Sequence, residues 1–124
     1  MVKTRTLKCA YTIYPTFIEK DPNTGKFSGL FYDLTEEVGK QLGLKIEWTE
    51  EVGSDAIMAG LGTRYDAVCA GYYAAPSRAW GGDFTKPLVF IPMYMWVRGK
   101  EVRFKTLEDF NREDIKLATL DGEI

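Results

Sequence analysis

The sequence contains no histidine among its 124 residues. This absence excludes the commonest general base, the Ser-His and Cys-His nucleophile arrangements and most zinc sites. A net charge of -2, with no cluster of lysine and arginine interleaved with aromatic residues, argues against a nucleic-acid partner. We therefore expect no nucleic acid, no metal and no cofactor.

Cysteine is scarce, with only Cys9 and Cys69 present. The two lie far apart in the sequence and form no Cys-x-x-Cys pair, so a metal or redox motif is not indicated. Each falls in a segment that we place at the centre of a sheet, and the two can meet there. We expect buried free thiols, since free cysteine packs as a small hydrophobic residue, and a disulfide is the alternative.

Long hydrophobic runs are also missing. The longest, residues 88–97, is about half of a bilayer span and contains Pro92. The first residues show no separate apolar segment of a secretory signal. The sequence as given is therefore expected to be soluble, and an exported protein expressed without its signal would have the same features.

The composition is that of one small soluble domain with one core. Hydrophobic residues make up 45% and charged residues 27% of the chain, unlike a disordered protein. Aromatic residues reach 14%, and aromatic faces often line small-molecule sites.

Strand and helix patterns alternate along the first part of the chain. They predict strands at residues 7–12, 44–49 and 65–70, and helices at residues 30–42 and 56–61. In the first helix Leu30, Leu34, Val38 and Leu42 form one apolar stripe, and Gly43 is placed to end it. Ser54 or Asp55 can cap the second helix. Between the first strand and the first helix, residues 21–25 (Asp-Pro-Asn-Thr-Gly) predict a hairpin turn.

This βαβαβ order predicts an α/β fold with parallel strands and right-handed crossovers, hence the strand order 2-1-3. The loops at residues 12–17, 50–54 and 70–78 then share one edge of the sheet, where such folds bind ligands. Later in the chain we expect a long strand at residues 88–97, a short helix at 106–111 and a last strand at 115–120.

The third strand opens into a loop that carries a candidate site. Arg78 ends this loop and is interpreted as an anion anchor, because a guanidinium matches a carboxylate with two hydrogen bonds. Tyr72 and Tyr73 are candidate walls of the pocket. The alternative is a solvated arginine with tyrosines packed at the edge of the sheet.

Four motifs in order resemble one protein family. They are residues 14–17 (Tyr-Pro-Thr-Phe), 25–34 (Gly-Lys-Phe-Ser-Gly-Leu-Phe-Tyr-Asp-Leu), 64–68 (Arg-Tyr-Asp-Ala-Val), and 76–78 (Pro-Ser-Arg) followed by 83–88 (Asp-Phe-Thr-Lys-Pro-Leu). The pattern is similar to the periplasmic solute-binding proteins of ABC transporters, in the group that binds amino acids. The resemblance implies a type II periplasmic binding protein-like lobe, with residues 1–100 as the first lobe. Residues 101–124 would be the crossover and first strand of a truncated second lobe.

The same resemblance implies roles for individual residues. Arg78 corresponds to the arginine that clamps the ligand carboxylate, and Tyr14 to an aromatic ring that packs on the ligand. Ala70, Gly71 and the two tyrosines that follow fall where backbone and hydroxyl groups complete the anion site. Family members often carry serine or threonine at the positions of Gly71, Tyr73 and Ala75. Trp48 is a further candidate for the rim of the site, with core packing as the alternative.

The implied function is capture of a small carboxylated solute, an amino acid above all, by a periplasmic or extracellular receptor that works with ABC transporter membrane subunits. No catalytic residue is assigned. One alternative is an enzyme like the cyclohexadienyl dehydratases, with Glu50, Glu51 and Asp55 as candidate carboxylates, and another is a ligand-sensing domain. As an isolated piece the chain is expected to form a homodimer, with exchange of residues 88–124 as one route.

Overall fold

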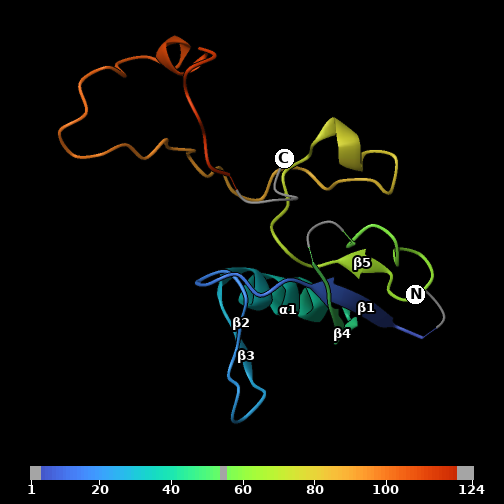
Figure 1. Cartoon of the computed structure of the whole chain (residues 1–124). Coiled ribbons are helices and arrows are strands. Elements are labelled where there is room, and N and C mark those ends of the chain that lie inside the picture. Colours follow the sequence, from blue (N-terminus) through green and yellow to red (C-terminus); the bar gives the residue numbers. More distant parts are fainter. Residues whose placement is uncertain (1–3, 54–55, 120–124) are drawn as a thin grey trace. The chain divides into compact units, whose positions relative to one another are not determined.

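The computed structural model describes residues 4–53 and 56–119. The chain divides into two compact units, which we treat separately: unit 1 is Met1–Phe84 with Gly122–Ile124, and unit 2 is Thr85–Asp121. Unit 1 contains the sheet, the long helix and a small hairpin (Figure 1). The assignment of residues 1–100 and 101–124 to two lobes stays a prediction. Within the described ranges, no helix is long and apolar enough to cross a membrane.

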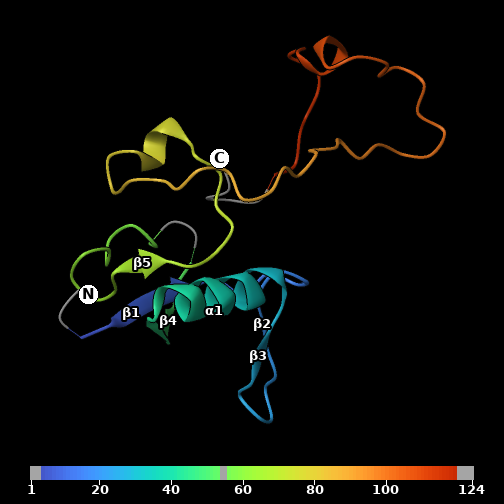
Figure 2. The same ribbon diagram turned by 180° about the vertical axis from the view of Figure 1, so that it is seen from behind.

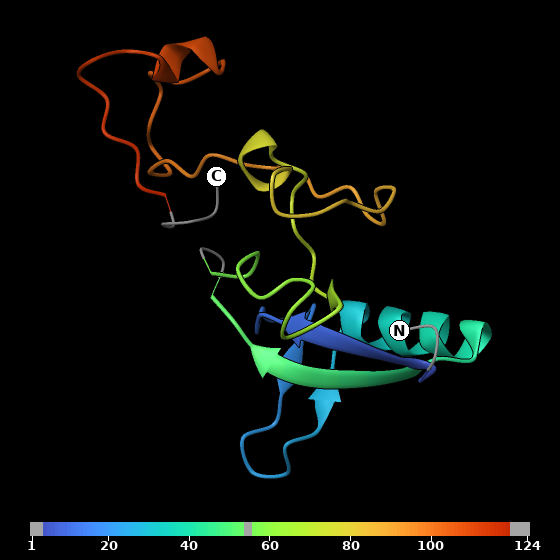
Figure 3. The ribbon, with the colours of Figure 1, turned by 90° about the vertical axis from the view of Figure 1, so that its right-hand side faces the viewer.

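The centre of unit 1 is a parallel sheet of three strands in the order β4-β1-β5. They are β1 (Thr6–Tyr11), β4 (Lys45–Glu51) and β5 (Ala67–Val68). Across the sheet, β4, β1 and β5 are the second, first and third predicted strands, so the 2-1-3 arrangement is confirmed (Figure 3). The third strand is shorter than predicted, because only two residues of β5 pair with β1.

A single long helix, α1 (Leu30–Leu42), runs along the sheet (Figure 2). Both of its predicted ends are confirmed. Gly43 follows in the left-handed conformation with φ 64°, and its N–H reaches the carbonyls of Gly39 and Lys40. The helix approaches β4 closely at Gly39, where an added Cβ would lie 2.6 Å from Cγ1 of Ile46.

The apolar stripe of α1 does not face the sheet. An amphipathic helix is expected to bury such a stripe, yet Leu30, Leu34, Val38 and Leu42 are between 36% and 66% exposed. The buried positions of α1 are Phe31 and Gly39 instead. Because of the close contact at Gly39, the side of α1 that carries Phe31 and Gly39 faces the sheet. The apolar stripe therefore stays on the surface.

A short antiparallel hairpin joins β1 to α1 and consists of β2 (Glu19–Lys20) and β3 (Phe27–Ser28). The predicted turn at its tip is confirmed. The Asp21 carboxylate accepts hydrogen bonds from the backbone N–H groups of Asn23 and Thr24, both at 2.8 Å. These bonds hold the pKa of Asp21 below its ordinary value.

The predicted helix at residues 56–61 is wrong. The described part of this segment is a series of tight turns, with hydrogen bonds from Ala59 N–H to the Ala56 carbonyl and from Leu61 N–H to the Met58 carbonyl. Six residues are too few to form a stable helix without strong tertiary support. Moreover, the Gly60 carbonyl accepts from the backbone N–H groups of Thr63, Arg64 and Tyr65, which form the next turn. The two proposed cap residues lie outside the described residues.

Two apolar clusters contain consecutive residues of β1, so they lie on opposite faces of the sheet. Ala10 joins the first, with Val52, Ile57 and Tyr65. Tyr11 joins the second, which also contains Ile18 and Phe31. The first cluster is closed by the turns after β4, and the second by α1 and the hairpin.

Cys9 and Cys69 form a disulfide, so the expectation of free thiols is wrong. The reason is the register of the sheet. Cys9 pairs with Ala67, and the N–H of Cys69 donates to the Ala10 carbonyl at 2.9 Å. This arrangement leaves the two Cα atoms 5.4 Å apart, within the usual range for a disulfide.

Unit 2 contains none of the predicted regular elements in its described residues. Residues 88–97 and 115–119 are irregular, and the predicted helix at 106–111 is reduced to a 3-10 turn, η2 (Glu108–Phe110). The Asp109 carboxylate accepts from Lys105 N–H and Thr106 N–H and closes the turn that leads into η2. A strand needs a partner for its backbone groups, and the described part of unit 2 supplies none to residues 88–97. Leu120, the end of the last predicted strand, lies outside the described residues.

Candidate functional site

The ends of the three parallel strands meet at one edge of unit 1, which we call the strand-end edge. Thr12 follows β1, Val52 follows β4 and Tyr72 comes after β5. The Thr12 hydroxyl donates to the Val52 carbonyl at 2.7 Å, and its oxygen lies 2.8 Å from the Tyr72 phenol oxygen. The expectation that these loops share an edge is therefore confirmed.

Arg78 ends a 3-10 turn, η1 (Pro76–Arg78), on the loop that leaves this edge. Its guanidinium carbon lies 4.9 Å from the centroid of the Tyr72 ring, and its Nη1 donates to the Tyr73 carbonyl at 3.3 Å. A guanidinium at this distance over an aromatic face is in cation–π contact. Arg78 and Tyr72 are thus brought together, whereas contact of Arg78 with a ligand stays a prediction.

Tyr14 lies in the loop after β1, with its ring exposed. The loop is tightly turned: the Tyr14 carbonyl accepts from the backbone N–H groups of Phe17 and Ile18, and the Tyr14 N–H donates to the Ile18 carbonyl. The Tyr14 and Phe17 rings are 5.7 Å apart. A fixed backbone with an exposed ring is compatible with the predicted role of Tyr14 as a ring that packs on the ligand, which stays a prediction.

Gly71 has a packing reason that the sequence did not reveal. A Cβ at this position would lie 2.1 Å from Cε2 of Phe31, the buried residue in the first turn of α1. The preceding Ala70 packs against the same cluster. The backbone of the candidate anion loop therefore lies directly against α1, and a serine at position 71 has no room here. Tyr73, two residues on, is exposed.

Trp48 is not gathered with the other candidates. Its ring is surrounded by Tyr11, Phe27 and Tyr32, with centroid distances from 5.2 to 6.0 Å. Its indole N–H donates to Glu36 Oε1 of α1 at 2.7 Å. These contacts favour the core-packing alternative, and we leave Trp48 out of the proposed site.

The carboxylates of the enzyme alternative form no cluster in the described residues. Glu50 Oε1 is paired with Arg64 Nη1 at 2.7 Å, and Glu51 is exposed. Asp55 lies outside the described residues. Across residues 4–53 and 56–119, no three histidine, cysteine or acidic side chains gather in a way that could hold a metal ion.

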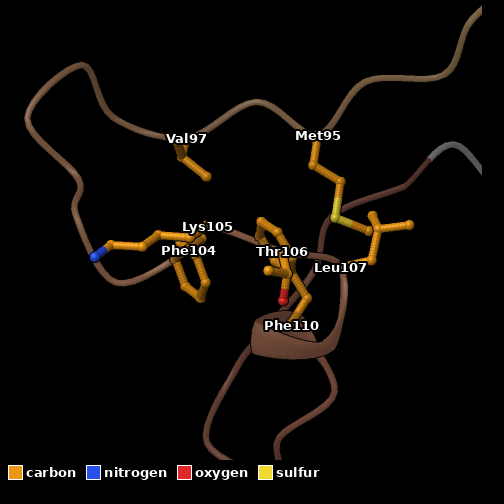
Figure 4. A pocket seen from close by; sticks show the side chains of 7 residues that line it. All are labelled: Met95, Val97, Phe104, Lys105, Thr106, Leu107 and Phe110. Carbon is orange, nitrogen blue, oxygen red and sulfur yellow. The ribbon is translucent and has the colours of Figure 1, made fainter.

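A cavity of about 350 Å³ lies within unit 2 and contains none of the predicted site residues. It is lined by Met95, Val97, Phe104, Lys105, Thr106, Leu107 and Phe110 (Figure 4). The rings of Phe104 and Phe110 are stacked 4.3 Å apart. Such a lining offers one cation and little else to orient a polar solute. Its size does not make it the solute site.

Thr12 is the residue at the strand-end edge that was missed as a candidate. Its signal in the sequence is its position directly after the first strand, on a loop already expected at this edge. A hydroxyl there has strand-end carbonyls within reach. Phe31 was missed as well, because a phenylalanine in a helix gives no indication of contact with a loop forty residues away.

The sheet, its strand order and its covering helix define an α/β fold of the type II periplasmic binding protein class. The chain belongs to the bacterial extracellular solute-binding proteins, family 3, whose family model matches residues 7–119. No protein with a curated description matches the chain.

Several solved structures are similar to the chain. An ancestral arginine-binding protein bound to arginine is 33% identical, with 66% of this chain and 36% of that one covered and a TM-score of 0.60. An ancestral cyclohexadienyl dehydratase is 30% identical over 91% of this chain and 47% of that one, with a TM-score of 0.60. An ancestral cationic amino acid solute-binding protein is 29% identical over 92% and 50%, with a TM-score of 0.61.

The chain thus spans between about a third and a half of the length of these three structures. The family and these neighbours support a solute-binding role.

Proposed function

We propose that unit 1 captures a small solute that carries a carboxylate, with amino acids as the ligand class. The observation that carries the proposal is the position of Arg78, whose guanidinium lies on the Tyr72 ring at the edge where three strands end. A charged fork of donors held at such an edge suits a carboxylate. Tyr14 and Tyr73 supply exposed rings on the neighbouring loops.

In this proposal the chain is part of an extracytoplasmic receptor that delivers its ligand to ABC transporter membrane subunits. The family supports this location and partnership, because its members are described as extracellular solute-binding proteins. Two similar structures are described as binding arginine or cationic amino acids. L-Arginine is therefore the first ligand to test, followed by L-lysine and L-glutamate.

The test is a titration of the 124-residue chain, followed by NMR chemical shifts up to tens of millimolar ligand. One lobe has about half of the contacts of a closed cleft, so we expect a dissociation constant of about 1 mM or weaker. Agmatine, which is arginine without its carboxylate, is the matched probe. Shifts at the strand-end edge with arginine but not agmatine are expected, and equal shifts with both would overturn the carboxylate assignment.

Arg78→Met removes the charge and keeps much of the side-chain length. Loss of a charge-assisted pair should weaken arginine binding by about 10- to 100-fold. Arg98→Met, in unit 2, removes the same charge elsewhere and should leave binding unchanged. A similar loss in both variants would indicate a general charge effect instead of a site.

The dehydratase alternative is retained for one reason: an ancestral cyclohexadienyl dehydratase is among the similar structures. Against it, Glu50 is held by Arg64. Incubation of the chain with prephenate or arogenate discriminates the two functions. Turnover that disappears in Glu50→Gln would favour the enzyme, and no turnover with intact arginine binding would favour the receptor.

We further propose that the isolated chain forms a homodimer through its apolar residues at 88–97. Phe90 and Trp96 are 88% and 94% exposed, and surface of this kind promotes association. Sedimentation velocity over a wide concentration range tests this. The double variant Phe90→Ser/Trp96→Ser should remain monomeric where the parent chain associates, and a monomeric parent at all concentrations would contradict the proposal.

A further inference from the structure

Thr12 occupies a position between two fixed groups at the strand-end edge. Its hydroxyl donates to the Val52 carbonyl at 2.7 Å. That carbonyl is held in place because Val52 is buried and its own N–H donates to the Tyr11 carbonyl at 2.9 Å. The direction of the Thr12 hydroxyl is therefore set by the ends of β1 and β4.

The polarity of the second bond follows from the first. A hydroxyl has one hydrogen to donate and two lone pairs to accept with. Because the Thr12 hydrogen is used on the Val52 carbonyl, the Tyr72 phenol donates to Thr12 Oγ1 across their 2.8 Å contact. The body of the Tyr72 ring packs against the cluster that contains Ala10 and Tyr65. The ring is thus fixed at its hydroxyl end and along its apolar body.

Arg78 rests on this fixed ring. Its guanidinium carbon is 4.9 Å from the Tyr72 ring centroid, and the Tyr73 carbonyl accepts from its Nη1. A guanidinium over a ring face moves when the ring turns, because the attraction depends on the ring's orientation. Thr12 is not among the residues proposed to contact the ligand, yet its hydroxyl bonds the ring on which Arg78 lies.

We propose that Thr12 is a positioning residue for Arg78, acting through the Tyr72 phenol. The chain of contacts runs from the carbonyl at the end of β4, through the hydroxyl after β1, to the ring after β5 and then to the guanidinium. Its importance for ligand capture rests on the proposed function, but the positioning itself is a property of the ligand-free chain.

The test reads the Arg78 side chain directly. A proton above an aromatic ring is shifted upfield, so the Arg78 Nε–H resonance should be upfield in the parent chain and should disappear from its position in Arg78→Met, which assigns it. Tyr72→Leu removes the ring and should abolish the upfield shift. Thr12→Val and Tyr72→Phe each remove one partner of the hydrogen bond but keep the ring, and both should reduce the shift. Thr12→Ser, which keeps the hydroxyl, should restore it.

The matched control is Thr49→Val. Thr49 also donates its hydroxyl to a strand carbonyl, that of Cys9 at 3.2 Å, but it carries no aromatic partner. Thr12→Val and Thr49→Val should lower the melting temperature to a similar extent, and only Thr12→Val should move the Arg78 resonance. Arginine binding should weaken by about three- to tenfold in Thr12→Val and stay within about twofold in Thr49→Val.

The two proposals fail in different ways. An Arg78 resonance that is unchanged by Thr12→Val but moved by Tyr72→Leu would overturn the positioning role, as would a parent chain with no upfield shift. A parent chain that binds none of the three amino acids, while its Arg78 resonance responds as described, would overturn the proposed function and leave the positioning role intact.

Discussion

Cys9 and Cys69 join the central strand of the sheet to the start of the loop that carries Tyr72 and Arg78. The strand directly before Cys69, β5, has only two residues paired with β1. The disulfide therefore adds a covalent link between this loop and the sheet, beside the contacts of Gly71 and Tyr72.

Replacing both cysteines should destabilise unit 1. The bridge joins residues 60 positions apart in the sequence and so restricts a long loop of the unfolded chain. Its removal is expected to lower the free energy of unfolding by about 2–4 kcal/mol. Urea unfolding of Cys9→Ala/Cys69→Ala against the oxidised parent measures this. Thiol counting in denaturant is the control: the oxidised parent should show no free thiol, and two reactive thiols would contradict the disulfide.

Gly71→Ala should destabilise the chain by overpacking. The new Cβ would lie 2.1 Å from the buried Phe31 ring, and such a clash is expected to cost about 1–3 kcal/mol. Phe31→Leu, which shortens the opposing side chain, should restore part of the loss in the double variant. Chemical unfolding of the four combinations gives the coupling between the two positions, and purely additive effects would show that they do not clash.

Trp48→Phe separates packing from ligand contact. The substitution removes the indole N–H that Glu36 accepts, so we expect a loss of about 1–3 kcal/mol of stability, with arginine binding unchanged. Unfolding and NMR titration of the same sample provide both values. A large loss of binding with unaltered stability would return Trp48 to the solute site.

Low pH should loosen the hairpin turn. Backbone N–H groups of Thr24 and Asn23 hold the pKa of Asp21 below its ordinary value of 3.8, because they stabilise the ionised form. The stabilisation is fully present above that value and is lost as the pH falls through the lowered pKa. A carboxyl titration by NMR should show the low pKa, and Asp21→Asn should remove the pH dependence of the turn. A midpoint at or above 3.8 would contradict the turn geometry.

The parts of the fold that the sequence predicted well are those with a strong local signal. The helix ends at Leu42 because Gly43 accepts a left-handed conformation, and the hairpin turns where Asp21 can accept from the backbone. The strand order followed from the handedness of two crossovers, even though the second crossover contains turns in place of a helix. The predicted topology is correct although one helix is wrong, because the connection from β4 to β5 is long enough to cross the sheet without a helix.

The errors have a common physical origin in contacts between distant residues. Residues 88–97 have the composition of a buried strand, but composition does not supply a partner for the backbone. Periodicity found the apolar stripe of α1, whereas the contact between Gly39 and Ile46 decided which line of residues faces the sheet. The candidate site was predicted as a set of loops at one edge, and the Thr12 hydroxyl and the disulfide depended on a register that the sequence does not state.

The contact of Gly71 with Phe31 sets an order for the divergence of this loop. A lineage that gains a hydroxyl side chain at position 71 must first accept a smaller residue at position 31, since the reverse order passes through an overcrowded intermediate. The two positions are thus epistatic. Transplanting a serine from a relative with a hydroxyl at this place is expected to succeed only when its helix residue is transplanted with it.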